Sequence, residues 1–204
     1  MGRVAERSHV TPSEYLAWER EQRARHEYFD GEVFAMAGGS MRHNALCGAV
    51  VETLRTALRG RGCFVMTSDQ RVAMDHGRRY VYPDVTGVCG EILMQPDARD
   101  VLLNPAILVE VLSASTEQYD RGLKWEGYQR IPSLTDYILA SQAEARIEIF
   151  RRGADGAWTY RAVGAGERLT LTGGVELDVD AIYAGAFELP GDDPTPLPAD
   201  DRRG

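Results

Sequence analysis

A short apolar segment, AILVEVL at residues 106–112, constrains the fold of this chain more than any other feature. Every side chain in it is apolar except that of Glu110. A strand that is apolar on both faces is typical of the buried middle of a sheet. A buried, ionised carboxylate is costly unless a cation or hydrogen-bond donors compensate its charge. Glu110 is therefore either a functional group or, in the simpler interpretation, a salt-bridged residue at the exposed end of the strand.

The segments on either side predict a mixed α/β fold. Thr11-Pro12-Ser13-Glu14 predicts the start of a helix, with Thr11 as the cap, proline at the first position and glutamate three residues after the cap. This helix is expected to run to about Arg25. Asp30-Gly31 predicts a hairpin. Further helices are predicted at 42–59 and 115–130, a polar loop at 90–105, and strands at 63–74, 80–89, 106–112, 136–140, 145–150, 157–163 and 174–179.

Together these elements predict a central mixed β-sheet flanked by helices, with additional antiparallel strands near the C-terminus. Residues 1–189 are expected to form a single domain, since 204 residues suit one ordinary domain. Residues 190–204, rich in proline and aspartate, are predicted to be a disordered tail.

Charge and cysteine content limit the class of protein. The net charge of −8 disfavours tight, sequence-independent DNA binding, yet residues 40–80 alone carry seven arginines and only three acidic residues. No run of eighteen apolar residues occurs, so no membrane partner is expected. The odd number of cysteines and the lack of a CxxC spacing predict free thiols at Cys47, Cys63 and Cys89, and hence a cytoplasmic protein.

Lysine is almost absent from the chain. Twenty-two of its 23 basic residues are arginine, and the exception is Lys124. Lysine is a compact point charge whose pKa responds to burial, whereas arginine is a planar fork that stays protonated. Lys124 is therefore either present by chance in an arginine-rich chain or has a function that arginine cannot perform.

A second acidic residue lies in an apolar, β-rich stretch. Asp84 follows Pro83 in YVYPDVTGV, and a proline inside a strand marks an edge or a distortion that turns the next side chain toward an opening. The alternative is an aspartate that caps a bend. Two carboxylates on adjacent strands would form an oxygen-only site suited to Mg²⁺ or Mn²⁺. The four histidines form no zinc motif, and no serine lies in a GxSxG elbow.

These residues carry a resemblance to a known family. The Pro83-Asp84 pair followed by EVL at 110–112 is similar to the PD-(D/E)XK superfamily of nucleases, which has the restriction-endonuclease-like fold. More closely, YFDGEVFAM, YPDVTGV, ILVEVLSAST and DRGLKWEGYQ, in that order, resemble the bacterial Uma family, whose members are regarded as endonucleases. The similarity runs from about Thr11 to Phe150.

One position departs from the superfamily pattern. The usual lysine stands two residues after the glutamate, and here that residue is Leu112. The Uma-type pattern implies that Lys124 replaces it from the following helix, where Asp120, Lys124 and Tyr128 are spaced four apart on one face. The alternative for that face is a solvent-exposed ion pair of little energetic value.

Two further positions match the family. Glu27 resembles its early acidic residue, which completes the metal shell, and Glu32 could do the same from across the hairpin turn. His43 also matches a family position, although an ordinary surface or capping histidine explains it equally well.

The resemblance implies a metal-dependent endonuclease acting on nucleic acid, with DNA as the expected partner. Asp84, Glu110 and Glu27 would hold one or two Mg²⁺ or Mn²⁺ ions with the Val111 carbonyl, Lys124 would position the attacking water, and the products would be a 5′-phosphate and a 3′-hydroxyl. The family also suggests a homodimer. Arginines expected to contact phosphate are Arg55, Arg59, Arg71, Arg79 and Arg121.

Two alternatives belong to other classes. A catalytically inactive module on the same fold would bind nucleic acid or a protein without cleaving it, as the acidic net charge and Leu112 both suggest. A small-molecule hydrolase could use the same carboxylates, but no sequence feature favours it.

Overall fold

The apolar segment that dominates the sequence forms β9 (Ile107–Val111), and all five of its residues are buried. In the computed structural model, which describes residues 5–192, β9 lies inside a six-stranded sheet, here called the central sheet. It runs parallel to β10 and antiparallel to β6. The order of the central sheet is β12 (Trp158–Gly164), β11 (Arg146–Arg152), β10 (Asp136–Ala140), β9, β6 (Val85–Cys89) and β3 (Cys63–Thr67).

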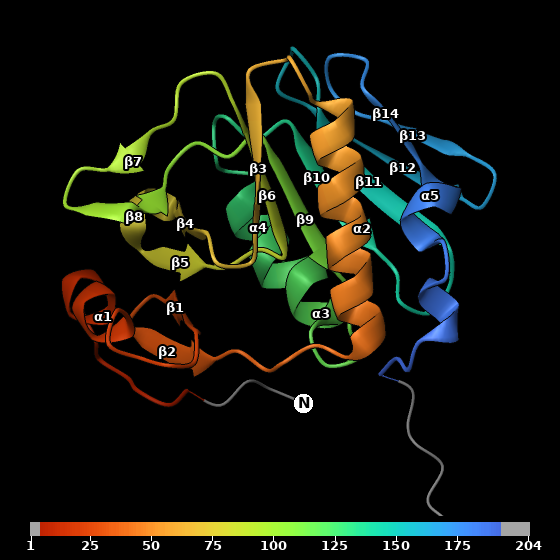
Figure 1. The fold of residues 1–204 in the computed structure, drawn as a ribbon. Coiled ribbons are helices and arrows are strands. Elements are labelled where there is room, and N and C mark those ends of the chain that lie inside the picture. Colours follow the sequence, from red (N-terminus) through yellow and green to blue (C-terminus); the bar gives the residue numbers. More distant parts are fainter. Residues whose placement is uncertain (1–4, 193–204) are drawn as a thin grey trace, which may run out of the picture.

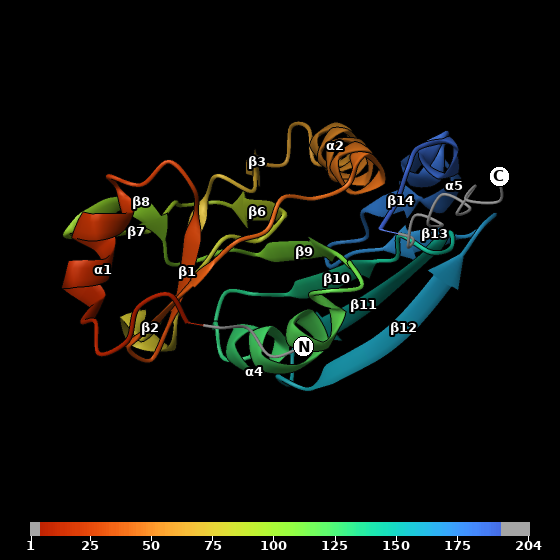
Figure 2. The same cartoon turned by 90° about the horizontal axis from the view of Figure 1, so that it is seen from below.

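Helices cover both faces of the central sheet, which explains why β9 is apolar on both sides. The side chains of Ile107, Val109 and Val111 join the core under α2 (Met41–Ala57), and those of Leu108 and Leu112 join the core that contains Tyr128 from α4 (Trp125–Tyr128). Figure 2 shows α2 above the central sheet and α4 below it.

A second sheet lies beside the central sheet (Figure 1). It too is mixed, because β4 and β8 are parallel and its other pairs are antiparallel. Its order is β2 (Glu32–Ala35), β1 (His26–Phe29), β5 (Arg79–Val81), β4 (Arg71–Met74), β8 (Ala98–Leu102) and β7 (Met94–Gln95).

The remaining elements are short. A two-stranded sheet of β13 (Arg168–Thr170) and β14 (Glu176–Asp178) leads into α5 (Val179–Tyr183). The helices not yet given are α1 (Pro12–Glu19), α3 (Glu117–Tyr119), a π-helical turn (Asp120–Lys124) and two 3₁₀ turns (Asp75–Gly77 and Ala186–Glu188). The predicted class, a mixed α/β fold with helices around a mixed sheet and antiparallel strands near the C-terminus, is confirmed.

The second sheet was not anticipated, because local patterns hid where strands break. The predicted strands 63–74 and 80–89 are each divided between the two sheets, so that β3 pairs with β6 and β4 pairs with β5. The predicted loop 90–105 contains β7 and β8. The predicted hairpin at Asp30-Gly31 is present, and a turn at 75–78 joins β4 to β5.

The first helix ends six residues earlier than predicted. Its capping box at Thr11 and Glu14 forms as expected, but α1 stops at Glu19. The carboxylate of Glu19 then accepts the backbone N–H of His26 at 2.9 Å, which fixes the start of β1. Sheet pairing by β1 therefore overrides the helical tendency of residues 20–25.

The prediction of three free thiols is wrong for two of them. Cys63 and Cys89 lie opposite each other on β3 and β6 and form a disulfide. Cys47 is free. No spacing motif marks this pair, because antiparallel pairing of distant strands brings together cysteines that are 26 residues apart.

Two other predictions concern the limits of the chain. Most of the predicted tail, residues 193–204, lies outside the described residues, and the single-domain boundary at 189 stays a prediction. Within residues 5–192, no helix combines the length and the apolar character needed to cross a membrane.

Candidate functional site

The predicted carboxylates and the single lysine meet in one pocket of about 400 Å³. Glu27 comes from β1, Glu110 from β9 and Lys124 from the π-helical turn. Asp84 lies where the chain leaves β5 of the second sheet and enters β6 of the central sheet, directly after Pro83. The strand interruption predicted from the proline is therefore the junction of the two sheets, and the pocket opens there.

Lys124 is the centre of the charge arrangement. Its side chain is only 6% exposed, and Nζ lies 2.9 Å from Oε1 of Glu110, 3.2 Å from Oδ1 of Asp120 and 3.4 Å from Oε1 of Glu27. Burial lowers the pKa of Lys124, but the three carboxylates outweigh burial and raise that pKa well above its ordinary value. The ammonium therefore stays protonated and acts as a fixed positive charge and hydrogen-bond donor.

Glu110 is held by two donors in the buried centre of the sheet. The Tyr128 hydroxyl donates to Oε1 at 2.7 Å, and the Lys124 ammonium donates to the same oxygen. Burial raises the pKa of Glu110 well above its ordinary value, and the charge of Lys124 offsets part of this. Because both donors use Oε1, the second oxygen, Oε2, is the one that a cation would take.

Asp84 is fixed by the backbone of β9. Its Oδ2 accepts the backbone N–H of Val111 at 2.8 Å, and Nε2 of His43 lies 3.3 Å from the same oxygen. Burial lowers the pKa of His43, but the hydrogen bond and the charge of Asp84 outweigh it and leave the pKa raised. His43 thus faces the site, an outcome for which its family position was the signal.

Glu27 and Glu32, the two early acidic residues, lie in different surroundings. Glu27 is buried beside Lys124, and its Oε2 accepts a hydrogen bond from the Tyr119 hydroxyl at 2.9 Å. Glu32 is exposed on β2 and does not line the pocket. Glu27 lies in β1 (His26–Phe29).

Asp120 is a site residue that sequence reasoning missed. Its side chain is 3% exposed, and Oδ1 has no hydrogen-bond partner although the Lys124 ammonium lies 3.2 Å away as an ion pair. Burial raises the pKa of Asp120. The four-residue spacing of Asp120, Lys124 and Tyr128 was the available signal, and the π-helical turn directs all three toward β9. Such π turns often occur at functional sites.

The donor set fits a hard divalent cation. Five acidic residues line the pocket and one lysine opposes them: Glu27, Asp84, Glu110, Asp120 and Asp192 against Lys124. Oxygen ligands of this kind suit Mg²⁺ or Mn²⁺. The buried Oδ1 of Asp120 is paired with the Lys124 ammonium at 3.2 Å but accepts no hydrogen bond of good geometry, so it keeps lone pairs that a cation could take.

Leu112 confirms that the usual lysine position of the strand is unavailable for charge. Its side chain is 6% exposed and packs in the apolar core with Tyr128 and Leu108. The ammonium group that contacts Glu110 belongs to Lys124 and comes from the π-helical turn.

Comparison with known proteins identifies the family. The sequence model of the Uma2 family, described as "Putative restriction endonuclease", matches residues 12–181. The chain belongs to the Uma2 family. The resemblance found in the sequence motifs is thereby confirmed.

Relatives and a solved structure agree with this assignment. An uncharacterized protein of Synechocystis, slr1290, is 37% identical over 86% of this chain and 92% of that protein. A second, sll1609, is 30% identical over 76% of this chain and 88% of that protein. A crystal structure from Anabaena variabilis, titled as a putative nuclease belonging to DUF820, is 13% identical. It matches with a TM-score of 0.70 over 87% of this chain and 99% of that one, which establishes a shared fold.

The five predicted phosphate-contacting arginines of this Uma2 chain lie in different environments. Arg71 is buried and bonded to the Tyr82 hydroxyl and to Asp100. Arg79 is only 13% exposed and pairs with two aspartates.

The other three are nearer to solvent. Arg55 and Arg59 are exposed on and just after α2, and two guanidinium nitrogens of Arg55 donate to the Val65 carbonyl. Arg121 is half-buried and makes a two-point ion pair with Glu148. The arginines therefore do not form one continuous exposed row.

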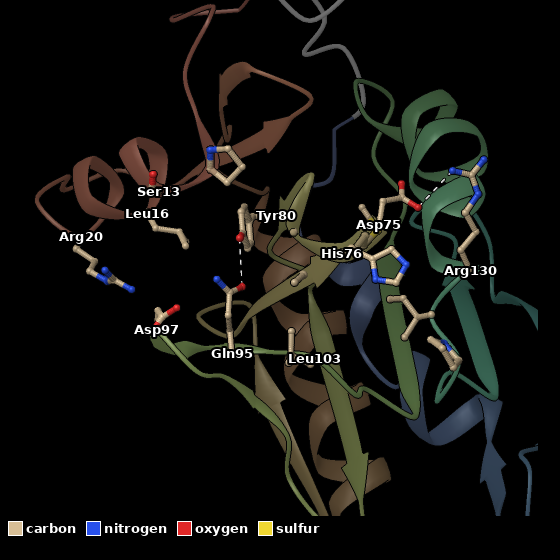
Figure 3. Close-up of a pocket in the computed structure, with 16 residues that line it drawn as sticks. Ser13, Leu16, Arg20, Asp75, His76, Tyr80, Gln95, Asp97, Leu103 and Arg130 are labelled. Atoms are coloured by element: carbon tan, nitrogen blue, oxygen red, sulfur yellow. Dashed lines mark hydrogen bonds and ion pairs between the residues drawn. The ribbon is translucent and has the colours of Figure 1, made fainter.

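Another cavity, of about 1000 Å³, lies apart from this chemistry (Figure 3). It is lined by α1 on one side and by the turn with Asp75 and His76 on the other. Tyr80 and Gln95 both line it, and the Tyr80 hydroxyl donates a hydrogen bond of 3.2 Å to Oε1 of Gln95. None of the clustered carboxylates of the candidate site lines this cavity. The larger cavity and the cluster of ionisable side chains therefore lie in different parts of the molecule.

Proposed function

We propose that this Uma2 chain is a metal-dependent endonuclease that hydrolyses phosphodiester bonds, with DNA as its substrate. The observation that carries the proposal is the contact of one buried ammonium, on Lys124, with three carboxylates in a pocket that Asp84 also lines. A site that combines hard oxygen ligands with a fixed positive charge matches the two needs of phosphoryl chemistry, which are cation binding and neutralisation of phosphate charge.

Asp84 and Glu110 would hold Mg²⁺ or Mn²⁺, and Asp120, which lines the same pocket, and the Val111 carbonyl would complete the set. When bound, the cation supplies Lewis acidity toward the phosphate and lowers the pKa of a coordinated water. Glu27 already engages Lys124 and Tyr119, so we assign it to holding the lysine as well as to the outer part of the metal shell.

Lys124 would orient the attacking water and offset the negative charge that builds on the phosphorus centre. It cannot serve as the general base, because the surrounding carboxylates raise its pKa and keep it protonated. Tyr128 fixes one oxygen of Glu110 and thereby directs the other toward the pocket. Arg121 lines an adjoining pocket that shares Ser113 and Asp192 with this site, and it is the arginine best placed to approach a flanking phosphate.

The test is a cleavage assay on plasmid and single-stranded DNA with Mg²⁺, Mn²⁺ or EDTA. We expect metal-dependent cleavage by the wild type and its loss in Lys124→Ala and Asp84→Asn. Asp97→Asn is the matched control, since Asp97 is an exposed carboxylate that lines the other cavity. Folding of each variant is checked by thermal melting.

Full metal-dependent cleavage by Asp84→Asn would refute the assignment of the site. Cleavage by Lys124→Ala would keep the nuclease and remove Lys124 from it. Binding of DNA without cleavage by folded wild type would favour the alternative, an inactive binding module on the same fold.

A further inference from the structure

Beside the oxygen-rich site lies a second group of potential ligands with a different chemistry. His43, Cys47 and Asp84 each offer one ligand atom, and these atoms lie within 4.8 Å of one another. His43 and Cys47 are four residues apart on one face of α2, and Sγ of Cys47 is 3.6 Å from Nδ1 of His43. The Asp84 carboxylate meets the other ring nitrogen at 3.3 Å.

From this geometry we infer that His43, Cys47 and Asp84 form a binding site for a thiophilic divalent cation such as Zn²⁺ or Co²⁺. One imidazole, one thiolate and one carboxylate are the ligand types that Zn²⁺ takes, and three protein ligands leave its fourth position to water. Mg²⁺ does not compete for a thiolate, so the site is chemically distinct from the carboxylate cluster.

The three ligand atoms lie within 4.8 Å of one another, and zinc bonds of about 2.0–2.3 Å would bring them to roughly 3.3–3.8 Å. Because one imidazole binds a cation through one nitrogen, the present contact of the His43 ring with either Cys47 or Asp84 would be replaced by a shared bond to the cation. The charges of a thiolate and a carboxylate balance those of the cation, and the thiol proton passes to the buffer on binding.

Gly39 keeps the histidine in place for this role. A Cβ built on Gly39 would lie 2.5 Å from Nδ1 and 2.8 Å from Cγ of the His43 ring, so the ring sits against this residue only because it has no side chain. Gly38, its neighbour, has no atom within 4 Å of such a Cβ. The two glycines therefore provide a matched pair of variants, neither of which replaces a ligand residue.

The Asp84 carboxylate links this site to the proposed nuclease site. Asp84 also belongs to the oxygen site of the proposed nuclease, so a thiophilic ion that captures it would withdraw a ligand from Mg²⁺. This consequence rests on the proposed function, whereas the binding itself does not. We therefore expect Zn²⁺ to inhibit cleavage at concentrations that fill the His43–Cys47–Asp84 site.

The experiment uses Co²⁺ as the probe and follows the near-ultraviolet charge-transfer band that a cobalt–thiolate bond produces. Cys47 is the only cysteine outside the disulfide, so in the absence of reductant a thiolate band reports on this site alone. We expect a band that saturates at one Co²⁺ per chain in the wild type and is displaced by Zn²⁺. It should be absent in Cys47→Ser and retained in Glu110→Gln, in which the oxygen site alone is damaged.

Gly39→Ala should weaken Co²⁺ binding at least about tenfold, and Gly38→Ala should leave it unchanged, since only the former displaces the His43 ring. Absence of the band in folded wild type, or its persistence in Cys47→Ser, would overturn the inference. Both results are independent of DNA cleavage, so a failure of the nuclease proposal leaves this test intact.

Discussion

The Nζ atom of Lys124 lies 2.9 Å from Oε1 of Glu110, although the lysine leaves a π-helical turn and the glutamate belongs to the buried strand β9. Both side chains are almost fully buried. A buried carboxylate in the middle of a sheet is thus compensated by the one lysine of the chain, as the cost of burying charge requires. This pairing is the basis of the first prediction.

Replacing Lys124 by methionine should lower the free energy of unfolding by about 3–5 kcal/mol, because three carboxylates then lose their buried cation. Metal-dependent cleavage should fall by at least about 100-fold, the usual effect of losing one group that stabilises transition-state charge. Urea denaturation and single-turnover cleavage measure the two effects. Lys124→Arg, which keeps the charge, is the control for stability; equal stability of the methionine variant and wild type would contradict the ion-pair argument.

Mg²⁺ or Mn²⁺ should stabilise the folded protein. A cation that binds only the folded state adds about 2.7 kcal/mol to the free energy of unfolding when present at 100 times its dissociation constant. Thermal melts of the wild type should therefore shift upward with either metal. Asp84→Asn should abolish the shift and Asp97→Asn should keep it. A shift of wild-type size in Asp84→Asn would place the metal elsewhere.

Glu148 should make stability depend on pH in the acid range. The hydrogen bonds from Arg121 lower the pKa of Glu148 to about 2, with Tyr160 and Arg146 also contributing. Because the folded pKa is lower than the unfolded value of about 4.3, the stabilisation is complete above about pH 4.3 and is lost as the pH falls toward 2.

The variant Glu148→Gln should therefore be less stable than the wild type by about 1–2 kcal/mol at pH 7, the range expected for hydrogen bonds to a charged group whose partners stay partly solvated. Urea denaturation should show this difference shrinking between about pH 4 and pH 2. Glu176→Gln, which removes an exposed ion pair with Arg168, should have little effect at pH 7. A Glu148→Gln difference that does not change with pH would argue against the lowered pKa.

The disulfide between Cys63 and Cys89 should stabilise the protein measurably. Closing a loop of 26 residues is worth roughly 3–4 kcal/mol in the chain-entropy treatment. A reductant should lower the urea midpoint of the wild type and leave that of a Cys63→Ala, Cys89→Ala double variant unchanged. If reduction has no effect on the wild type, the two thiols are not paired in solution.

Much of the site could be found in the sequence because its chemistry disturbs local patterns. Glu110 interrupts an apolar strand, Asp84 follows a proline inside another, and Lys124 is the one lysine among 22 arginines. Each residue departs from the pattern around it, and such departures are informative because an uncompensated charge is costly to bury. All three line the same pocket.

Asp120 and Cys47 were missed for the opposite reason. Asp120 looks like half of an ordinary helical ion pair, and Cys47 looks like one of three unpaired thiols. Only the packing of the π-helical turn and of α2 against the junction at Asp84 shows that both face the pocket or its border.

The sequence by itself determined where most of the longer helices and strands lie and which polar groups are too costly to bury without compensation, because both depend on short-range patterns and on the chemistry of single side chains. The tertiary structure alone decided the division of strands between two sheets, the pairing of Cys63 with Cys89 and the contact of Glu27 with Lys124. Those features depend on which distant segments pair. Such pairing is set by the burial of apolar surface over the whole chain and leaves no mark at fixed spacing in the sequence.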